Sequence, residues 1–334
     1  MDHPNSKLSQ RRLRQNPWIR DLVREHRVSH TQLIQPYFVV QGIKDREAIA
    51  GLTGTFRETP DTLLKQVEKD MEAGVRKILL FGVPGEKAQN GFKYDFTAKQ
   101  IAALRKRFGQ ELFISVDVCL CSYTESGHCG ILNPEGNHVQ NDVTVEQLAK
   151  AALQYAQAGA DCVAPSDMMD GRIAAIRESL DEAGLDQALL MSYSAKFHSK
   201  FYGPFRLAAD SAPNAKASKL NDRATYQIDP ANLRDARSSS WRDVEEGADI
   251  LMVKPGLPYL DVLAKLSAEI DKPWAVYEVS GEYAGIELMA QQGLINGPAA
   301  HLESWTAFVR AGASMIITYG ARFGRDWIKK STED

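Results

Sequence analysis

The sequence contains no long apolar run, little cysteine and no large excess of either charge. No apolar stretch approaches the roughly 18 residues that a membrane-spanning helix requires. The net charge of −3 on 334 residues gives no general attraction to nucleic acid or to anionic lipid. We therefore expect a globular protein that binds neither a membrane nor a nucleic acid.

The first thirty residues are basic but lack the features of a targeting segment. They contain neither the apolar stretch nor the small-residue cleavage site of a secretory signal. Asp2, Asp21 and Glu25 argue against an amphipathic transit peptide, which is poor in acidic residues. The sequence therefore predicts a cytoplasmic protein with an N-terminal extension over residues 1–30.

Eight short apolar runs alternate with helical patterns along the chain, which is typical of repeated βα units. The runs are apolar nearly throughout, as expected for parallel strands that are covered on both faces. They occupy residues 33–40, 76–83, 112–118, 161–166, 188–194, 249–255, 274–280 and 314–320. Together they predict an α/β fold, a (β/α)8 TIM barrel over residues 31–334. A doubly wound sheet is the alternative, but no GxGxxG motif follows the first run.

Three of the intervening segments have recognisable helix ends. Residues 144–160 begin with Thr144 three residues before Gln147, which is the spacing of a capping box. Residues 59–74 and 301–312 each end at glycine, a common helix stop.

Polar side chains stand at the ends of six of the eight apolar runs. In a TIM barrel the chemistry takes place at the C-terminal ends of the strands. In chain order these residues are Asp117, Ser166 with Asp167, Lys196, Lys254, Ser280 and Tyr319. Scattered loop residues would produce part of this pattern, but not two lysines on adjacent strands.

The two lysines predict a nucleophilic amine. Adjacent strands lie about 4.8 Å apart, so ammonium groups at equivalent heights repel each other. Repulsion and burial both favour the neutral amine and lower the lysine pKa. A neutral lysine attacks carbonyl groups and forms a Schiff base. The alternative is that Lys196 and Lys254 simply point to solvent from the strand ends.

Three of the four cysteines, Cys119, Cys121 and Cys129, lie together as C-x-C-x7-C. A disulfide framework would need more cysteines at regular spacings. A closed structural zinc site needs four ligands, usually in CxxC pairs. His128 is a candidate fourth ligand, but beside Cys129 it would point another way on an extended segment, and Cys162 lies inside a predicted strand. We therefore predict a catalytic zinc with one open position; reduced thiols without metal are the alternative.

The segment between Lys196 and the sixth run is far longer than most βα loops. Its first half, residues 197–229, is rich in Gly, Pro, Ser and basic residues. Long segments of this kind often close over barrel active sites. Arg206 and Arg223 are the best candidates in it to bind a carboxylate through two parallel hydrogen bonds.

With these residues in view, the chain resembles the porphobilinogen synthase family, also called δ-aminolevulinic acid dehydratase. The matching stretches span essentially the whole chain after the extension: DVCLCSYTESGHCG, APSDMMDGR, MSYSAKF, SKFYGPFR, YQIDPAN, EGADILMVKPG, YLDV, VSGEY and TYG. The resemblance implies the condensation of two 5-aminolevulinate molecules to porphobilinogen with loss of two waters, an early step of tetrapyrrole (heme) biosynthesis.

The resemblance also implies a role for each candidate residue. It implies the principal Schiff base at Lys254, a second at Lys196, and Asp117 near the amino group of the second substrate. It implies zinc on the three cysteines. The carboxylate of one substrate would bind Arg206 and Arg223, and that of the other Ser280 and Tyr319.

The resemblance also gives expectations for the oligomeric state and for the positions at which this chain departs from the family. The family is typically a homo-octamer whose N-terminal arms wrap neighbouring subunits, which gives residues 1–30 a role. Ser239 stands where many bacterial members carry a glutamate for an allosteric magnesium, so that ion is not expected. Glu278 replaces a usual glutamine and is expected to place a carboxylate close to the site, and Gly285 replaces a usual methionine.

Two other functions stay open at this point. Another Schiff-base TIM-barrel lyase, such as a class I aldolase, would need one lysine and no cysteine cluster. A non-catalytic metal-binding relative should have lost one of the two lysines, and both are present.

Overall fold

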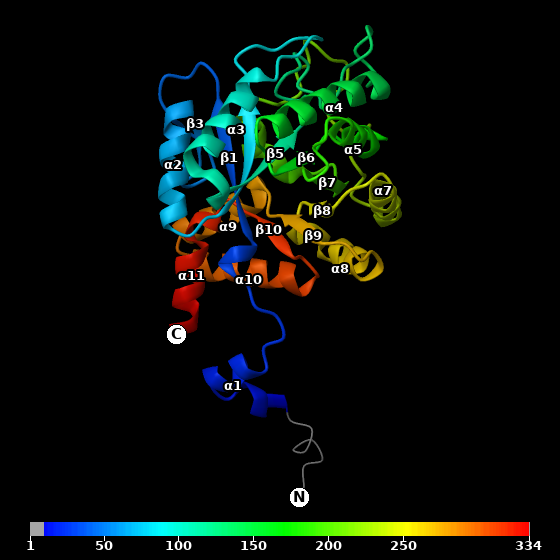
Figure 1. The fold of residues 1–334 in the computed structure, drawn as a ribbon. Coiled ribbons are helices and arrows are strands. Elements are labelled where there is room, and N and C mark those ends of the chain that lie inside the picture. The colour runs from blue at the N-terminus through cyan, green and yellow to red at the C-terminus, as the bar shows by residue number, and fades with distance from the viewer. Residues whose placement is uncertain (1–9, 334) are drawn as a thin grey trace, which may run out of the picture.

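The computed structural model describes residues 10–333, and its centre is a closed barrel of parallel strands (Figure 1). Eight strands follow one another around the barrel in chain order, and β10 pairs with β1 to close it. These strands are β1 (Leu33–Val40), β4 (Lys77–Val83), β5 (Phe113–Val118), β6 (Cys162–Pro165), β7 (Leu189–Lys196), β8 (Ile250–Lys254), β9 (Trp274–Tyr277) and β10 (Met315–Ile317). The predicted TIM barrel and its eight strands are confirmed.

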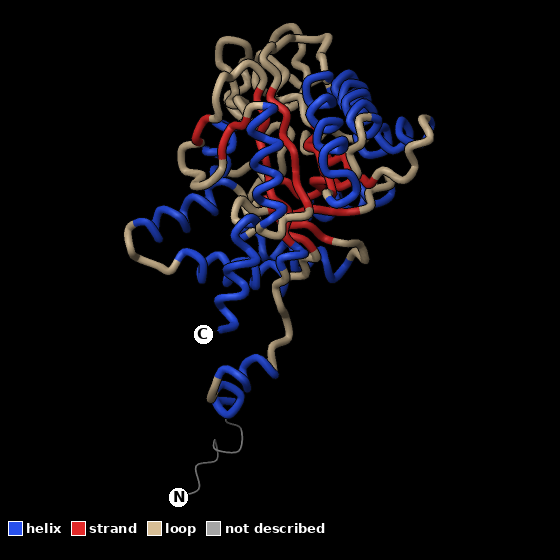
Figure 2. Tube along the Cα trace, turned by 60° about the vertical axis from the view of Figure 1, so that its left-hand side comes forward, coloured by secondary structure: helices blue, strands red, loops and turns tan. Residues whose placement is uncertain are grey.

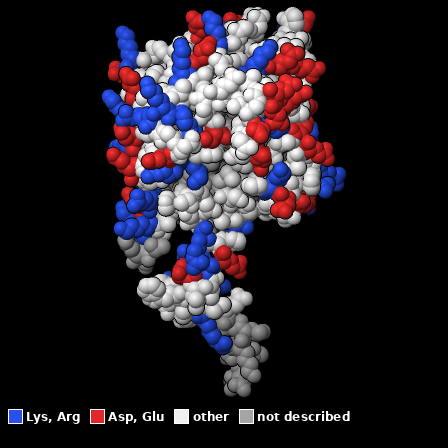
Figure 3. Space-filling model, in the orientation of Figure 1, with Lys and Arg blue, Asp and Glu red and all other residues white. Residues whose placement is uncertain are grey.

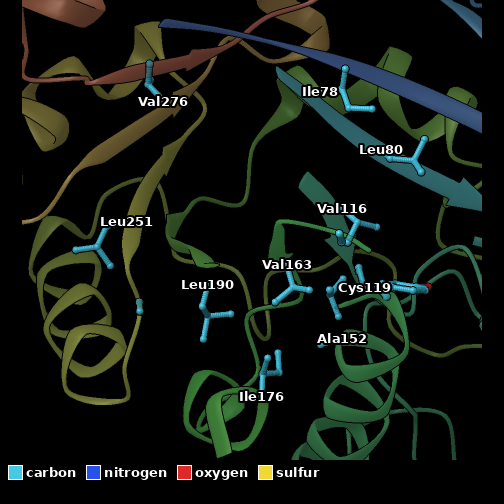
Figure 4. Close-up of a cluster of buried hydrophobic side chains, with 14 of the residues drawn as sticks. Ile78, Leu80, Val116, Cys119, Ala152, Val163, Ile176, Leu190, Leu251 and Val276 are labelled. Atoms are coloured by element: carbon cyan, nitrogen blue, oxygen red, sulfur yellow. The ribbon is translucent and has the colours of Figure 1, made fainter. Parts of the chain in front are cut away.

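Helices surround the barrel strands (Figure 2). They are α2 (Pro60–Glu72), α3 (Asp95–Phe108), α4 (Asn141–Gln157), α5 (Arg172–Glu182), α7 (Leu233–Glu245), α8 (Leu260–Glu269), α9 (Ser280–Gln291), α10 (Gly297–Arg310) and α11 (Ala321–Glu333). Figure 4 shows Val116, Val163 and Leu190 of the strands beside Ala152 of α4 and Ile176 of α5, all of them buried. This apolar layer holds the helices on the barrel, because it removes both surfaces from water.

The side chains of each strand alternate between this outer layer and the barrel interior. The interior holds a second apolar cluster, rich in aromatic rings, which includes Phe38, Phe81, Tyr193, Tyr277 and Tyr319. This alternation decides which residues at the strand ends enter the barrel mouth.

Shorter elements complete the chain. A two-stranded hairpin of β2 (Glu47–Ala48) and β3 (Phe56–Glu58) extends the sheet where β3 pairs with the end of β1. The remaining helical segments are α1 (Pro17–Leu22), α6 (Gly203–Ala208) and the short 3-10 turns η2 (Gln10–Arg14), η3 (His30–Gln32), η4 (Gly109–Glu111), η5 (Lys200–Tyr202) and η6 (Leu257–Tyr259). No helix within residues 10–333 combines the length and the apolar character needed to cross a membrane.

The predicted helix ends agree with the structure in two cases and not in the third. Helix α2 begins after Thr59, whose hydroxyl accepts a hydrogen bond from the Thr62 N–H at 3.1 Å. Helices α2 and α10 end two residues before the predicted stops at Gly74 and Gly312, and both glycines have positive φ. Helix α10 begins at Gly297, four residues before the predicted start. The capping box at Thr144 is wrong, because α4 already begins at Asn141. The Thr144 hydroxyl instead donates to the Gln140 carbonyl at 2.6 Å, inside the helix.

The segment before the barrel lies apart from it. In Figures 1 and 2, α1 stands away from the strands and the helices around them. Its apolar side chains are exposed: Trp18 is 83% and Leu22 is 80% exposed. The division into an arm at 1–30 and a barrel at 31–334 remains a prediction, and residues 1–9 of that arm lie outside the described residues.

Candidate active site

Lys196 and Lys254 are neighbours in the barrel wall. They end β7 and β8 and are direct partners in the register between these two strands. Both are buried, with 5% and 3% of their surface exposed. The alternative in which both lysines point to solvent is therefore wrong. The Nζ of Lys196 donates a hydrogen bond to the Ser166 carbonyl, at the end of β6.

An irregularity in β7 is what places Lys196 inside the barrel. The register between β7 and β8 shifts by one residue between Ser192 and Ala195, as in a β-bulge. Tyr193 belongs to the interior cluster and Ala195 to the outer layer. Strict alternation from Tyr193 would direct Lys196 outward, so the extra residue returns it to the interior side.

Lys254 lies in a pocket of aromatic rings. Its Nζ is 4.1 Å from the ring centre of Tyr277, 4.9 Å from that of Phe205 and 5.0 Å from that of Tyr193. Burial lowers the pKa of Lys254 to about 7, and the charge of Lys196 acts in the same direction. A large share of this amine is therefore neutral at physiological pH, as a nucleophile toward a carbonyl requires.

Asp117 faces both lysines from β5. Burial raises the pKa of Asp117 to about 6, against the opposing effect of the charges on Lys196 and Lys254. Its Oδ1 atom is buried and has no hydrogen-bond partner among the described residues. A carboxyl group with this pKa can accept and release a proton near neutral pH.

The three clustered cysteines converge after β5. The Sγ atoms of Cys119, Cys121 and Cys129 all lie within 4.8 Å of one another, and all three residues are buried. Hydrogen bonds from the other two thiols hold the pKa of Cys129 well below its usual range, and Arg223 acts in the same direction. The cluster could hold a metal ion. Three soft sulfur donors, with no fourth protein ligand among residues 10–333, suit zinc with one open position.

His128 is not part of this cluster. Its Nδ1 lies 3.0 Å from the Tyr226 hydroxyl and its Nε2 lies 3.2 Å from the Leu220 carbonyl oxygen. A carbonyl only accepts, so Nε2 carries the proton and Nδ1 accepts from Tyr226. The tyrosine oxygen in turn accepts from the Cys129 N–H at 3.2 Å. His128 thus supports the cysteine loop from outside, and Cys162 lies elsewhere, inside β6.

Arg206 and Arg223 come from the long segment after β7. Arg223 is buried and donates from Nη2 to the carbonyls of Gly127, at 3.0 Å, and Ser211, at 2.6 Å. Burial and the nearby charge of Arg223 lower the pKa of the half-buried Arg206. The Nε atoms of both arginines are buried without a hydrogen-bond partner among the described residues. Two adjacent guanidinium groups with unused donors fit a carboxylate ligand.

Ser280 and Tyr319 follow β9 and β10, the two strands that come after β8 around the barrel. The Ser280 hydroxyl accepts from the Phe205 N–H at 3.0 Å and lies 3.3 Å from the Phe201 carbonyl oxygen. The Tyr277 hydroxyl donates to the Tyr319 hydroxyl at 3.3 Å. Ser280 therefore contacts the same segment that carries Arg206, which connects the two candidate carboxylate sites.

Ser166 and Asp167, at the end of β6, have different surroundings. The Ser166 carbonyl binds Lys196, as described above. Asp167 is buried, accepts from the Met169 N–H at 2.7 Å and lies 3.7 Å from Arg172. Its second oxygen has no hydrogen-bond partner among the described residues.

Tyr193 and Gln227 are two further buried polar side chains that the sequence analysis missed. The Tyr193 hydroxyl and both polar atoms of the Gln227 side chain are buried without a partner in the described part of the chain. Tyr193 lies beside both lysine Nζ atoms, at 5.0 Å and 5.7 Å from its ring centre. Period-two spacing from Lys196 points to Ser194 and not to Tyr193, because the bulge in β7 breaks the alternation. Gln227 lies in a turn, where its N–H donates to the Arg223 carbonyl at 3.0 Å.

Glu278 does not reach the lysines, contrary to expectation. It follows Tyr277, an interior residue, and points to the other face of β9. There it contacts His301 Nδ1 at 3.0 Å and Trp305 Nε1 at 3.0 Å, both on α10, and accepts from Thr318 at 2.5 Å. The carboxylate therefore belongs to the layer between barrel and helices. Ser239, on α7, accepts a hydrogen bond at 3.1 Å from Arg242, which pairs with Asp243 and Asp170.

Known proteins share this arrangement of sequence and fold. The sequence model of a family described as delta-aminolevulinic acid dehydratase matches residues 7–327. The chain belongs to this family. It is 44% identical over 315 residues to a delta-aminolevulinic acid dehydratase of Methanothermus sociabilis, covering 93% of this chain and 95% of the relative. A Bacillus subtilis relative of the same name is 39% identical over 322 residues, covering 95% and 97%.

A solved structure extends the likeness to three dimensions. The delta-aminolevulinic acid dehydratase (porphobilinogen synthase) of Toxoplasma gondii ME49, in complex with the reaction product porphobilinogen, superposes with a TM-score of 0.90. It is 40% identical, and the match covers 96% of this chain and 91% of that one. The family member in that structure thus has the same barrel over almost its whole length.

Proposed function

We propose that this protein is a porphobilinogen synthase, a hydro-lyase that condenses two 5-aminolevulinate molecules to porphobilinogen with loss of two waters. The observation that carries the proposal is the pair of buried lysines, Lys196 and Lys254, in register on neighbouring strands of a chain from this family. Two amines suit a reaction in which two keto acids must be held and activated.

Lys254 forms the principal Schiff base in this proposal. Its neutral Nζ attacks the ketone carbon of one substrate, and the carbinolamine loses water to give the imine. Phe205, Tyr193 and Tyr277 surround the amine and exclude bulk water from the imine, which protects it from hydrolysis. Ser280 and Tyr319 bind the carboxylate at the other end of this substrate.

Lys196 forms a Schiff base with the second substrate in the same way, and Asp117 acts as the base for the amino group of that substrate. Asp117 accepts a proton from the amino group of that substrate, leaving the nitrogen lone pair free for bond formation. Its pKa of about 6 suits a group that must take up and return a proton within one turnover. The carboxylate of this substrate binds Arg206 and Arg223.

Cys119, Cys121 and Cys129 hold a zinc ion in this proposal. Bound zinc supplies a Lewis acid that polarises a carbonyl or hydroxyl oxygen. The low pKa of Cys129, to which the charge of Arg223 contributes, favours the thiolate form of this one ligand. The Tyr226 hydroxyl keeps the Cys129 backbone in place.

The long segment after β7 acts as a lid. Tyr202 and Phe205 of this segment lie over Lys254, with ring centres 5.5 Å and 4.9 Å from its Nζ. Because the amine is buried beneath them, substrate can enter only when the segment moves. Closure then brings Arg206 into place and removes water in one motion.

We also propose a cytoplasmic homo-octamer assembled through the N-terminal arms and acting in heme biosynthesis. The exposed Trp18 and Leu22 on α1 support a role for the arm in contacts between copies, since large apolar side chains gain free energy by burial. The surface in Figure 3 carries both signs of charge.

Allosteric magnesium is not part of the proposal, because Ser239 offers no carboxylate and Arg242 brings a positive charge to that position.

The test is incubation of the purified protein with 5-aminolevulinate, with and without a zinc chelator. We expect a pyrrole product that appears only without the chelator. Borohydride added during turnover should attach substrate to the peptide that contains Lys254. A protein that makes no pyrrole in the presence of zinc would overturn the proposal.

A further inference from the structure

Glu282, in the first turn of α9, connects the chain segments that follow β8 and β9. Its side chain is buried, and 5% of the residue is exposed. Its Oε1 accepts a hydrogen bond from the Leu257 N–H at 2.5 Å. Its Oε2 accepts from the N–H groups of Gly256, at 3.2 Å, and Val279, at 2.7 Å. One carboxyl group thus caps its own helix at Val279 and also binds two backbone donors of the segment after β8.

These two segments carry the two ends of a proposed substrate site. Gly256 follows Lys254 by two residues, and Val279 directly precedes Ser280. The ladder between β8 and β9 ends at the pair Val253 and Val276, so Lys254 and Ser280 both lie beyond its last pair. Beyond the ladder, the Glu282 carboxylate is the group that joins the two segments by hydrogen bonds from both sides. Burial raises the pKa of Glu282 to about 8, and the three backbone N–H donors act in the opposite direction.

We propose that Glu282 is a positioning residue that fixes the distance between the Lys254 amine and the carboxylate site at Ser280 and Tyr319. It thereby selects keto acids in which two methylene groups separate the ketone from the carboxylate. This inference rests on the proposed function, in which one substrate is held at both ends. Glu282 touches neither the substrate nor the amine, and it acts through the two segments.

A fixed distance between the two ends gives selectivity for chain length. A substrate bound covalently at its ketone carbon reaches Ser280 and Tyr319 only if its chain spans the gap. In a rigid site, one methylene more or fewer changes the relative rate by about 10- to 200-fold. If the two segments moved independently, the site would adapt to a longer chain and this discrimination would fall.

The test compares two keto acids without an amino group, 4-oxopentanoate with two intervening methylenes and 5-oxohexanoate with three. Neither acid can complete the condensation, so both report only on imine formation and carboxylate binding. Each is incubated with the zinc-loaded full-length enzyme, the imine is reduced with borohydride, and the adduct on the Lys254 peptide is measured by mass spectrometry. We expect wild-type enzyme to favour 4-oxopentanoate by about tenfold or more.

Glu282→Gln should reduce this preference at least about threefold, because its amide NH2 faces backbone N–H groups and one segment is released. Glu282→Asp, which keeps the carboxyl group but is too short to bind both segments, should change the ratio in the same direction. It serves as the second variant if the glutamine protein does not fold. Glu287→Gln is the matched control on α9, because Glu287 contacts His301 at 3.3 Å and not these segments. Its ratio should equal that of wild type.

The ratio separates positioning from stability, because a partly unfolded variant loses both adducts in the same proportion. An unchanged ratio in both Glu282 variants, or no preference in a wild-type enzyme that makes porphobilinogen, would overturn the inference alone. A wild-type enzyme that forms neither adduct at Lys254 nor porphobilinogen would overturn the proposed function, and the inference with it.

Discussion

The two lysines and the residues proposed to serve them are positioned in different ways. Lys196 and Lys254 belong to paired strands, and the register of the barrel decides where their amines lie. The cysteines and Arg223 stand in segments between elements, and Arg206 stands in the short helix α6; the hydrogen bonds that hold them include those from Arg223 to the Gly127 and Ser211 carbonyls. The barrel wall therefore supplies a rigid nucleophile, whereas the loops supply groups that can adjust as substrate enters.

The largest effect should come from removing the nucleophile in the barrel wall. Lys254→Ala should lower porphobilinogen formation by at least about 10³-fold, as expected when the group that forms the covalent intermediate is lost. The midpoint of thermal unfolding should not fall, because a buried amine is costly to the folded state. Borohydride labelling that persists at full yield on another peptide would show that the imine forms elsewhere.

Removing one cysteine thiol from the loop should weaken zinc binding without unfolding the barrel. Cys129→Ala should weaken zinc binding by more than the roughly 10- to 100-fold that changes around a metal site usually cost. Metal content per subunit after dialysis is the measurement, with circular dichroism to check the fold. Cys162→Ala is the matched control, since Cys162 lies within β6, and its zinc content should equal that of wild type.

The arginines allow a finer test, because in the proposed function they bind the carboxylate of one substrate only. Arg206→Ala should raise KM about tenfold, which corresponds to about 1.4 kcal/mol of lost binding. Arg206→Lys should recover only part of this, since lysine lacks the planar fork. Arg223→Ala should also loosen the loop at Gly127. Single-turnover imine formation at Lys254 should survive in these variants; if it fell together with pyrrole formation, the two carboxylate sites would not be separate.

The smallest effect should appear in the pH dependence of imine formation. The neutral amine is the reactive form, so the rate at Lys254 should rise as pH increases through about 7 and then level off. At pH 6 it should be about tenfold below the plateau. The charge of Lys196 lowers the pKa of Lys254, so Lys196→Ala should move the midpoint to higher pH. An unchanged midpoint would mean that burial alone sets this pKa.

Much of the fold and part of the site could be predicted before the structure. Eight apolar runs predicted eight parallel strands, because a strand covered on both faces needs apolar side chains along its whole length. Asp117, Lys196 and Lys254 stood out as polar residues at the ends of such runs. Local patterns carried this information, and it concerns the residues that belong to regular elements.

The sequence by itself therefore determined the barrel, its strand order and the strand ends at which chemistry can occur. Only the tertiary structure decided which face each of these side chains takes. A single extra residue in β7 returns Lys196 to the interior, and the alternation of β9 turns Glu278 outward. The same holds for Glu282, which binds Val279 of its own helix start but also Gly256 and Leu257, 26 and 25 residues away in the chain. Pairing between distant segments sets these orientations, and local sequence patterns contain no record of it.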